Sequence, residues 1–199
     1  LLSFGHAMFF FVAGYATAHS IKMWGFDPAL GILLGVGLAA VIGALTGSLA
    51  IRRQGIYFSM ITLAFSQLVY FMALRMPFTG GEDGLQDVPR RAMFGFINMG
   101  NNYVMYFVVL ALTAFGFFAI YRIVNSPFGQ VLKAIRDNEP RAISLGYRAN
   151  RYKLVVFILS ASLAGLAGSI KAVAFQVVTL TDLTWVTSGE ALLICILGG

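Results

Sequence analysis

The sequence predicts an all-α membrane protein, a polytopic bundle of transmembrane helices. Hydrophobic residues make up 59% of the chain and charged residues only 11%, whereas about 25% of the residues in a soluble domain are charged. The mean hydropathy is +0.82. The apolar residues form stretches of about 20, the length that crosses a bilayer as a helix, without the alternation of barrel strands. Together these observations exclude a soluble globular fold.

Five complete apolar stretches and the beginning of a sixth define the expected helices. The first has no charged region before it and no cleavage site, so we interpret it as a membrane helix and not as a signal peptide. The chain begins without Met and stops within an apolar run, so we expect residues 1–199 to be a single transmembrane domain, a fragment of a longer protein. The complete stretches cover residues 4–21, 29–51, 56–74, 103–123 and 154–175, and the truncated sixth begins near residue 191.

The basic residues predict how the helices are oriented. Arg52 and Arg53 separate the second and third stretches, and seven Lys or Arg residues against two acidic residues lie between residues 122 and 153. If each helix crosses once, both regions lie on the same side, and Lys and Arg gather on the cytoplasmic side of membranes. The loop over residues 75–102 then lies outside. The net charge of +6 therefore reflects membrane topology and does not indicate nucleic-acid binding.

Small residues recur along two of the stretches at every fourth position. Such stripes let helix backbones approach closely in lipid. We expect them to pack against neighbouring helices, and the functional alternative is that shallow contacts let the helices slide. The stripe of the second helix and the two adjacent stripes of the fifth are Gly31, Gly35, Ala39, Gly43 and Gly47; Ser160, Ala164 and Gly168; and Ala161, Gly165 and Ser169.

A polar, basic segment over residues 126–153 lies between the fourth and fifth stretches. Ser126 suits a helix N-cap and Pro127 the first helical position. Pro140 is expected to end this helix or to begin a second short one, and Gly146 suits a left-handed C-terminal cap. The sequence therefore predicts a structured insert where a short turn would suffice.

The first helix of this segment is predicted to be amphipathic. Val131, Leu132 and Ile135 form an apolar stripe at helical spacing, and Lys133 and Arg136 point away from it. Two interpretations follow from the pattern. The stripe forms a surface on which a cytoplasmic protein docks, or the helix lies on the membrane lipid with its basic residues among the headgroups.

No residue pattern predicts catalysis, a cofactor or a metal ion. The chain has no GxxxxGK[ST] phosphate loop, no HExxH and no paired-cysteine motif, and Cys195 is its single cysteine. The ionisable residues near the apolar stretches are His6, His19, Lys171 and Glu190, and none is clearly central, which argues against a proton-coupled carrier. We therefore expect that the chain is not an enzyme. A membrane-embedded enzyme would need a convergent set of catalytic residues, and the sequence shows no such set.

Four stretches of the sequence carry a resemblance to a known family. They are GIYFSMITLAFSQLVY at 55–70, TGGEDGL at 79–85, SPFGQVLKAIRDNEPRAISLGY at 126–147 and RYKLVVFILSASLAGLAG at 151–168. The chain resembles the membrane permease subunit of branched-chain amino acid ABC importers, the hydrophobic amino acid uptake family. The last two stretches, in this order and spacing, are specific to the family, and the resemblance covers nearly the whole chain.

The resemblance implies a function and a set of partners. Such permeases lie in the bacterial inner membrane and pair with a second related permease, two cytoplasmic ATPases and a periplasmic substrate-binding protein. The implied activity is translocation of a branched-chain or other hydrophobic amino acid, driven by ATP hydrolysis on the separate ATPases. Members of the family also carry urea, amides or aromatic acids. A stand-alone secondary carrier is the alternative from another class.

The resemblance also implies a role for the basic segment. In the family, a short cytoplasmic helix of the permease sits in a groove on an ATPase and transmits its opening and closing. The segment over residues 126–145 matches that position, in agreement with the docking interpretation. The candidate residues of this ATPase-coupling segment are Phe128, Val131, Leu132, Ile135, Arg136, Asn138, Glu139 and Arg141.

The TGGEDGL loop follows the third helix on the predicted outer side. Its three glycines permit positive φ angles, so we expect a fixed turn at the outer mouth of the path. Its two acidic residues then meet basic residues of the binding protein, since complementary charge favours encounter; the alternative is a turn whose acids are merely solvated. The candidate residues are Thr79, Gly80, Gly81, Glu82, Asp83 and Gly84.

Overall fold

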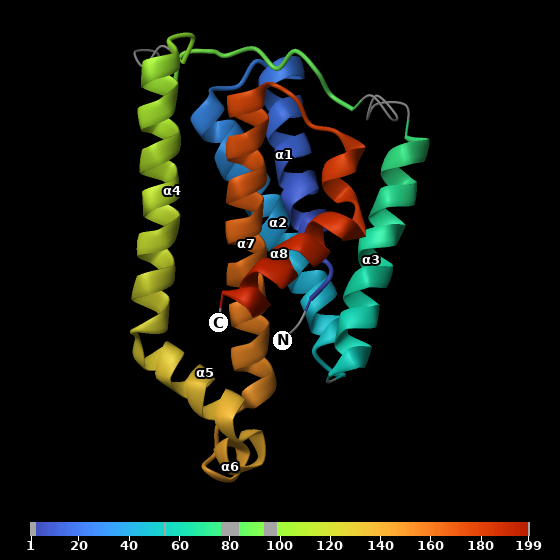
Figure 1. The fold of residues 1–199 in the computed structure, drawn as a ribbon, viewed down its shortest axis with the longest axis vertical. Helices are drawn as coiled ribbons and strands as arrows, with labels where there is room; N and C mark the ends of the chain where they lie inside the picture. The colour runs from blue at the N-terminus through green and yellow to red at the C-terminus, as the bar shows by residue number, and fades with distance from the viewer. Residues whose placement is uncertain (1–2, 54, 77–83, 94–98, 199) are drawn as a thin grey trace.

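The computed structural model describes residues 3–53, 55–76, 84–93 and 99–198, which form a helical bundle (Figure 1). Within these residues the regular elements are all helices, and the predicted fold class is confirmed. The elements are α1 (His6–Met23), α2 (Pro28–Ala50), α3 (Ile56–Arg75), α4 (Asn102–Val124), α5 (Pro127–Asp137), α6 (Glu139–Ser144), α7 (Ala149–Phe175), the 3₁₀ helix η3 (Leu180–Leu183) and α8 (Trp185–Leu197).

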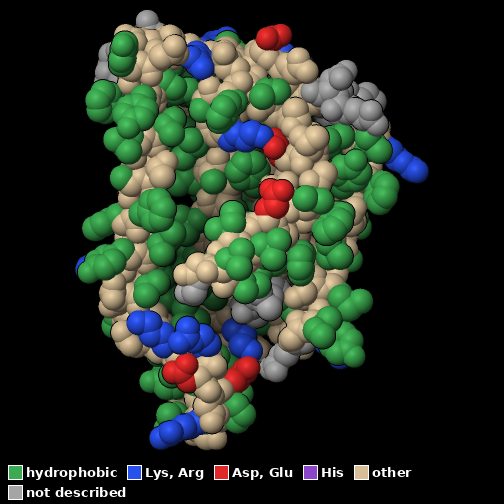
Figure 2. All heavy atoms as spheres, in the orientation of Figure 1, with side chains coloured by type: hydrophobic (Ala, Val, Ile, Leu, Met, Phe, Trp, Pro, Cys, Tyr) green, Lys and Arg blue, Asp and Glu red, His purple; other side chains and the backbone are tan. Residues whose placement is uncertain are grey.

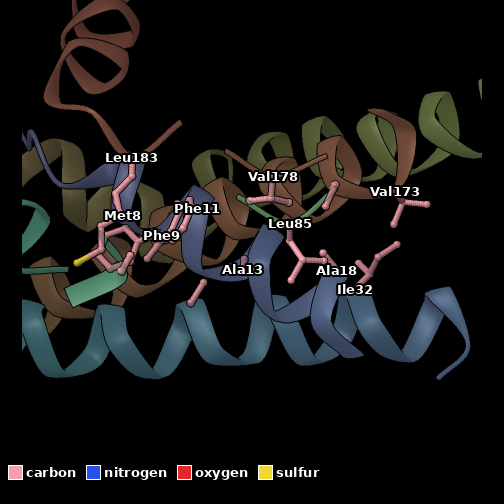
Figure 3. Close-up of a cluster of buried hydrophobic side chains, with 14 of the residues drawn as sticks. Met8, Phe9, Phe11, Ala13, Ala18, Ile32, Leu85, Val173, Val178 and Leu183 are labelled. Carbon is pink, nitrogen blue, oxygen red and sulfur yellow. The ribbon is translucent and has the colours of Figure 1, made fainter. Parts of the chain in front are cut away.

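The helices α1, α2 and α7 pack against one another and form the centre of the bundle (Figure 1). Small residues bring their backbones together. A methyl group on Gly14 would lie 2.9 Å from the carbonyl oxygen of Gly168, and one on Gly165 would lie 2.5 Å from Cβ of Ala39. Figure 3 shows buried side chains of this core, including Met8, Phe9, Phe11, Ala13, Ile32, Val173 and Leu183.

Four of the described helices, α2, α3, α4 and α7, are long and apolar enough to cross a membrane. The helix α1 matches the first predicted span, but it has only 18 residues and includes His6, His19 and Lys22, and it is not among the four. The expected sixth helix begins at Trp185, and α8 is a short apolar helix of 13 residues. Four of the five complete helices expected are therefore supported as spans by length and composition, and the fifth, α1, stays a prediction.

The chain reverses direction at two opposite ends of the bundle (Figure 1). The turn between α2 and α3, which carries Arg52 and Arg53, lies at the same end of the bundle as α5 and α6, as the prediction that the two basic regions share one side requires. Figure 2 shows Lys and Arg side chains gathered near that end, and apolar side chains along the outer helices.

At the opposite end, the segment before α4 is joined to the segment after α7. Leu85 and Val178 form an isolated antiparallel bridge, with backbone hydrogen bonds of 2.9 and 3.0 Å. Gly84 has a φ of +68°, and a methyl group there would collide with the carbonyl oxygen of Val178. The turn therefore requires glycine at residue 84.

The helix α4 lies at the edge of the bundle, and contacts at both ends attach it. At its start, the Arg90 guanidinium donates hydrogen bonds of 2.9 Å to Asn102 Oδ1 and to the carbonyl oxygen of Ala174 in α7. Its other end continues into α5. Between these attachments an apolar cleft of about 480 Å³ separates α4 from α2 and α7, and side chains such as Ile32, Leu33, Val36, Leu112, Phe115, Leu163 and Leu166 line it.

Candidate functional site

The basic segment between α4 and α7 folds into a helical hairpin, formed by α5 and α6, that protrudes from the bundle (Figure 1). The Ser126 hydroxyl accepts a hydrogen bond of 3.3 Å from the N–H of Gly129, and Asn138 Oδ1 accepts one of 3.0 Å from the N–H of Arg141. Each side chain satisfies a backbone donor in the first turn of a helix. The predicted N-cap at Ser126 is therefore confirmed.

The helix α6 ends in a left-handed turn at Gly146, whose φ is +90°, as the sequence predicts. The N–H of Gly146 donates to the carbonyl oxygen of Ile143 at 2.9 Å, and the N–H of Tyr147 donates to that of Ala142 at 3.2 Å. These two bonds form a Schellman motif, which satisfies the last carbonyl groups of the helix. The chain enters α7 three residues after this glycine.

The helix α7 begins at Ala149 and not at residue 154, where its apolar stretch starts. Its first residues are polar, yet they continue the same helix because none of them is a helix breaker. This single helix of 27 residues therefore runs from the protruding hairpin into the centre of the bundle.

Apolar side chains hold the hairpin onto the start of α7. Ile135 of α5, Ala142 of α6 and Ala149 of α7 form a small buried cluster, in which their exposed fractions are 5%, 2% and 4%. Val131 and Tyr152 pack against this cluster. The contact joins all three helices, so the apolar stripe of α5 is partly occupied within the chain itself.

An aromatic pair and an ion pair reinforce this attachment. The rings of Phe128 and Tyr152 are stacked, with their centroids 5.5 Å apart. Lys153 Nζ lies 2.6 Å from Glu139 Oε1, and only 12% and 22% of the two side chains are exposed. A partly buried ion pair of this kind constrains the geometry of the groups that form it. The hairpin and the start of α7 are therefore one packed unit.

The outer surface of the hairpin carries both apolar and basic groups. Ile143 is 55% exposed and Leu145 is 71% exposed, and both lie at the end of α6. Lys133, Arg136 and Arg141 are also exposed, as predicted for the first two. Leu132 is half-buried. The large apolar side chains that the hairpin exposes most thus lie at the C-terminal end of α6.

The glycine stripe of α2 faces α1 and α7. A methyl group on Gly35 would lie 2.6 Å from both the carbonyl oxygen of Ala13 and the hydroxyl of Ser169. One on Gly43 would lie 2.7 Å from Cβ of Ala161. Gly31 and Gly47 are buried in the same contact, against Ile21 and Phe157 respectively.

The stripe of α7 faces α1. A methyl group on Gly168 would collide with the carbonyl oxygen of Phe10, so no larger residue fits at this crossing. Ser160 Oγ shares a hydrogen bond of 2.8 Å with His6 Nε2. Ala164 is half-buried against the main core. The small residues of α7 therefore place the membrane part of this helix directly against α1.

Of the predicted external loop, Thr79, Gly80, Gly81, Glu82 and Asp83 lie outside the described residues. Gly84 is described, and its positive φ forms the turn that precedes the bridge between Leu85 and Val178. Among the described residues, no group of three or more His, Cys, Asp or Glu side chains comes together in a way that would hold a metal ion.

A family model for the permease component of branched-chain amino acid transport systems matches residues 1–199. The chain belongs to this permease family. The curated relatives of the permease include the high-affinity branched-chain amino acid transport system permease protein LivM of Escherichia coli, which is 30% identical over 100% of this chain and 52% of its own length. LivM of Salmonella typhimurium is 29% identical over the same shares. The ribose import permease protein RbsC of Bacillus subtilis is 32% identical over 73% of this chain and 44% of its own length.

The permease chain thus spans about half the length of the LivM relatives that it matches. No solved structure gives a significant match. The family and the apolar helices together show a multi-pass membrane protein, a component of a transport system.

Sequence reasoning about the permease overlooked the residues that fix the hairpin. Lys153 was counted only as part of the basic segment, and Glu139 only as a docking residue, whereas the structure pairs them with each other. The exposed Ile143 and Leu145 were also missed, because the six-residue helix α6 is too short to show a clear period. The available signal for this ion pair was that Glu139 and Lys153 lie on opposite sides of the turn predicted at Gly146.

Proposed function

We propose that this chain forms the membrane-spanning part of a permease subunit in an ABC importer of the bacterial inner membrane. Its partners are two cytoplasmic ATPases, a second related permease and a periplasmic substrate-binding protein. The chain itself has no phosphate loop, so hydrolysis takes place on the separate ATPases and the permease converts their motion into opening of a path. The observation that supports this proposal is the hairpin, which protrudes from the bundle yet is packed onto α7.

The packing of the hairpin gives this coupling a physical route. A force applied to α5 and α6 reaches α7 through the Ile135 cluster and the ion pair of Lys153 with Glu139. The helix α7 is continuous into the core, where it packs against α1 and α2. Because packed helices move as units, displacement of the hairpin shifts α7 against its two neighbours.

The proposed docking surface differs from the stripe that was predicted from sequence. Ile135 is buried within the chain, and so it serves the hairpin instead of a partner. The exposed Ile143 and Leu145, flanked by Arg141, are the groups that an ATPase groove would cover. Leu132, Arg136 and Asn138 lie on the same hairpin and extend this surface in the proposal.

The experiment uses the full-length permease expressed with its neighbouring subunits. Replacing Ile143 and Leu145 together by Asp should abolish co-purification of the ATPases, because an unpaired charge in a buried interface costs roughly 3–5 kcal/mol. The conservative pair Ile143→Leu with Leu145→Ile keeps the apolar area and should retain the complex. Membrane insertion should be normal in both variants. Normal co-purification of the Asp variant would contradict docking and favour a hairpin that lies on the headgroups.

We propose branched-chain or other hydrophobic amino acids as the substrate, since the LivM relatives are named for branched-chain amino acid transport and match the whole chain. Ribose is the second candidate, because RbsC is named for ribose import and is 32% identical where it matches. Uptake of radiolabelled leucine, isoleucine, valine and ribose by cells that express the whole importer separates the two. Uptake of ribose without uptake of the amino acids would overturn the first assignment.

A further inference from the structure

A small, mostly apolar cavity that two arginines border lies between the last turn of α2 and the first turns of α7. Its volume is about 220 Å³, and its lining residues belong to the end of α2 and the start of α7, at the end of the bundle that carries the hairpin. It is separate from the apolar cleft beside α4 and from the hairpin surface described above. The residues that line it are Gly47, Ser48, Ile51, Arg52, Asn150, Arg151 and Leu154.

The charges of this cavity are not neutralised by the described part of the chain. Arg52 and Arg151 both line it. The two acidic residues at this end are engaged elsewhere, since Asp137 pairs with Arg136 at 3.5 Å and Glu139 pairs with Lys153 at 2.6 Å. No carboxylate within the described ranges forms an ion pair with either cavity arginine. Two unneutralised positive charges beside one small cavity attract an anion.

Further groups favour an anion in the same place. The cavity adjoins the first turn of α7, where the N–H groups at the start of a 27-residue helix carry partial positive charge. Asn150 brings a side-chain amide to the wall, and its N–H₂ group can donate hydrogen bonds. Arginine guanidinium groups bind phosphate in a bidentate manner. The chemistry of the wall thus fits a phosphate group.

The remainder of the wall is apolar. Ile51 ends the apolar run of α2, and Leu154 begins that of α7. Because both residues lie at the ends of predicted membrane spans, we expect the cavity to lie at the level where hydrocarbon gives way to headgroups. A free inorganic anion would use the arginines and leave this apolar wall uncovered. A ligand with an anionic head and an acyl tail would cover both.

We propose that this cavity binds the phosphate group of an anionic phospholipid from the cytoplasmic leaflet, with Arg52 and Arg151 on the phosphate and Leu154 against the start of the acyl chain. The lipid links the end of α2 to the start of α7. Binding at this site is independent of the proposed import activity, because it requires neither an ATPase nor a substrate.

Native mass spectrometry of the full-length permease in detergent, with phosphatidylglycerol or phosphatidylcholine added, tests the proposal. One tightly bound phosphatidylglycerol is expected, and phosphatidylcholine should not replace it. Replacing Arg52 and Arg151 by Gln should weaken binding by roughly 30-fold, since each basic residue near an anionic lipid surface contributes roughly fivefold. Ser48→Phe keeps both charges but fills the cavity, and it should also remove the bound lipid.

A charge-matched control is Arg122→Gln with Arg148→Gln, two exposed basic residues at the same end that do not line the cavity. This variant should retain the bound lipid. Equal loss of lipid in the control and in the cavity variants would show diffuse surface attraction and overturn the proposal. Displacement of phosphatidylglycerol by millimolar inorganic phosphate would assign the site to a free anion. Retained lipid with loss of the ATPases in the arginine variant would assign the arginines to a protein partner.

Discussion

At the scale of single residues, close packing of the core helices depends on glycines, which carry no side chain. Gly35 lies over a buried polar contact, in which the Thr17 hydroxyl bonds to the carbonyl oxygen of Gly31 at 3.0 Å and to Ser169 Oγ at 2.9 Å. Thr17 and Ser169 are fully buried. Hydroxyl contacts of this kind link membrane helices because hydrocarbon offers no alternative partner. The glycine allows α2 to approach these two groups.

Gly35→Ala should therefore destabilise the bundle by roughly 1–3 kcal/mol, the usual cost of overpacking. The added methyl group would lie 2.6 Å from the carbonyl oxygen of Ala13, which is backbone and cannot turn away. Thermal unfolding of the full-length permease in detergent measures the change.

The matched control for this change is Gly37→Ala in the same helix. A methyl group on Gly37 would meet no atom within 4 Å, so its melting temperature should stay within about 2 °C of the wild-type value, as for a surface substitution. Equal melting temperatures for the two variants would show that the close approach at Gly35 is not required.

At the scale of elements, the proposed coupling depends on the packed contact between the hairpin and the start of α7. It combines the cluster around Ile135 with a stacked aromatic pair and the ion pair of Glu139 with Lys153. The nearby pair of Arg136 with Asp137 has 81% and 69% of its side chains exposed. Exposed pairs contribute little to stability, whereas a partly buried pair leaves an uncompensated charge when one partner is removed.

Glu139→Gln should therefore loosen α6 by roughly 1–3 kcal/mol, less than a fully buried pair would cost because water still reaches both side chains. Hydrogen–deuterium exchange should become faster in α6 and remain unchanged in α1, α2 and the membrane part of α7. Arg136→Gln serves as the exposed comparison and should leave the exchange of α6 unaltered. Exchange that rises equally in both variants would refute a special role for the partly buried pair.

At the scale of the whole molecule, a compact centre of α1, α2 and α7 supports two outer helices with large apolar surfaces. Residues such as Tyr57, Phe71, Phe107 and Phe117 of α3 and α4 are exposed. In water such surfaces would aggregate, and in a membrane they face lipid or other helices. The basic residues at one end predict which side faces the cytoplasm.

Single cysteines at the two ends test this orientation. Ser144→Cys in α6 and Gln86→Cys at the opposite end, each in a Cys195→Ser background, place exposed thiols at the two ends of the bundle. An impermeant thiol reagent added outside intact spheroplasts should label residue 86 and not residue 144. Labelling of both residues from one face would contradict the predicted topology.

The sequence by itself determined the class of the fold and the family. Long apolar stretches, basic residues at helix ends, and the Ser126 and Gly146 caps are local signals, and local physical rules are enough to interpret them. The same rules located the hairpin, which α5 and α6 form at the expected place. They also predicted a first membrane helix where α1 lies, and four of the other helices meet the length and composition of a span.

Only the tertiary structure decided which side chains of the hairpin are used within the chain. Periodicity grouped Ile135 with Leu132 as one apolar stripe, yet burial of Ile135 depends on Ala142 and Ala149, which lie on two other helices. The pairing of Glu139 with Lys153, and the cavity that joins Arg52 to Arg151, likewise bring together residues far apart in the sequence. Such contacts depend on how whole helices pack, and a period of 3.6 residues along one helix carries no information about its neighbours.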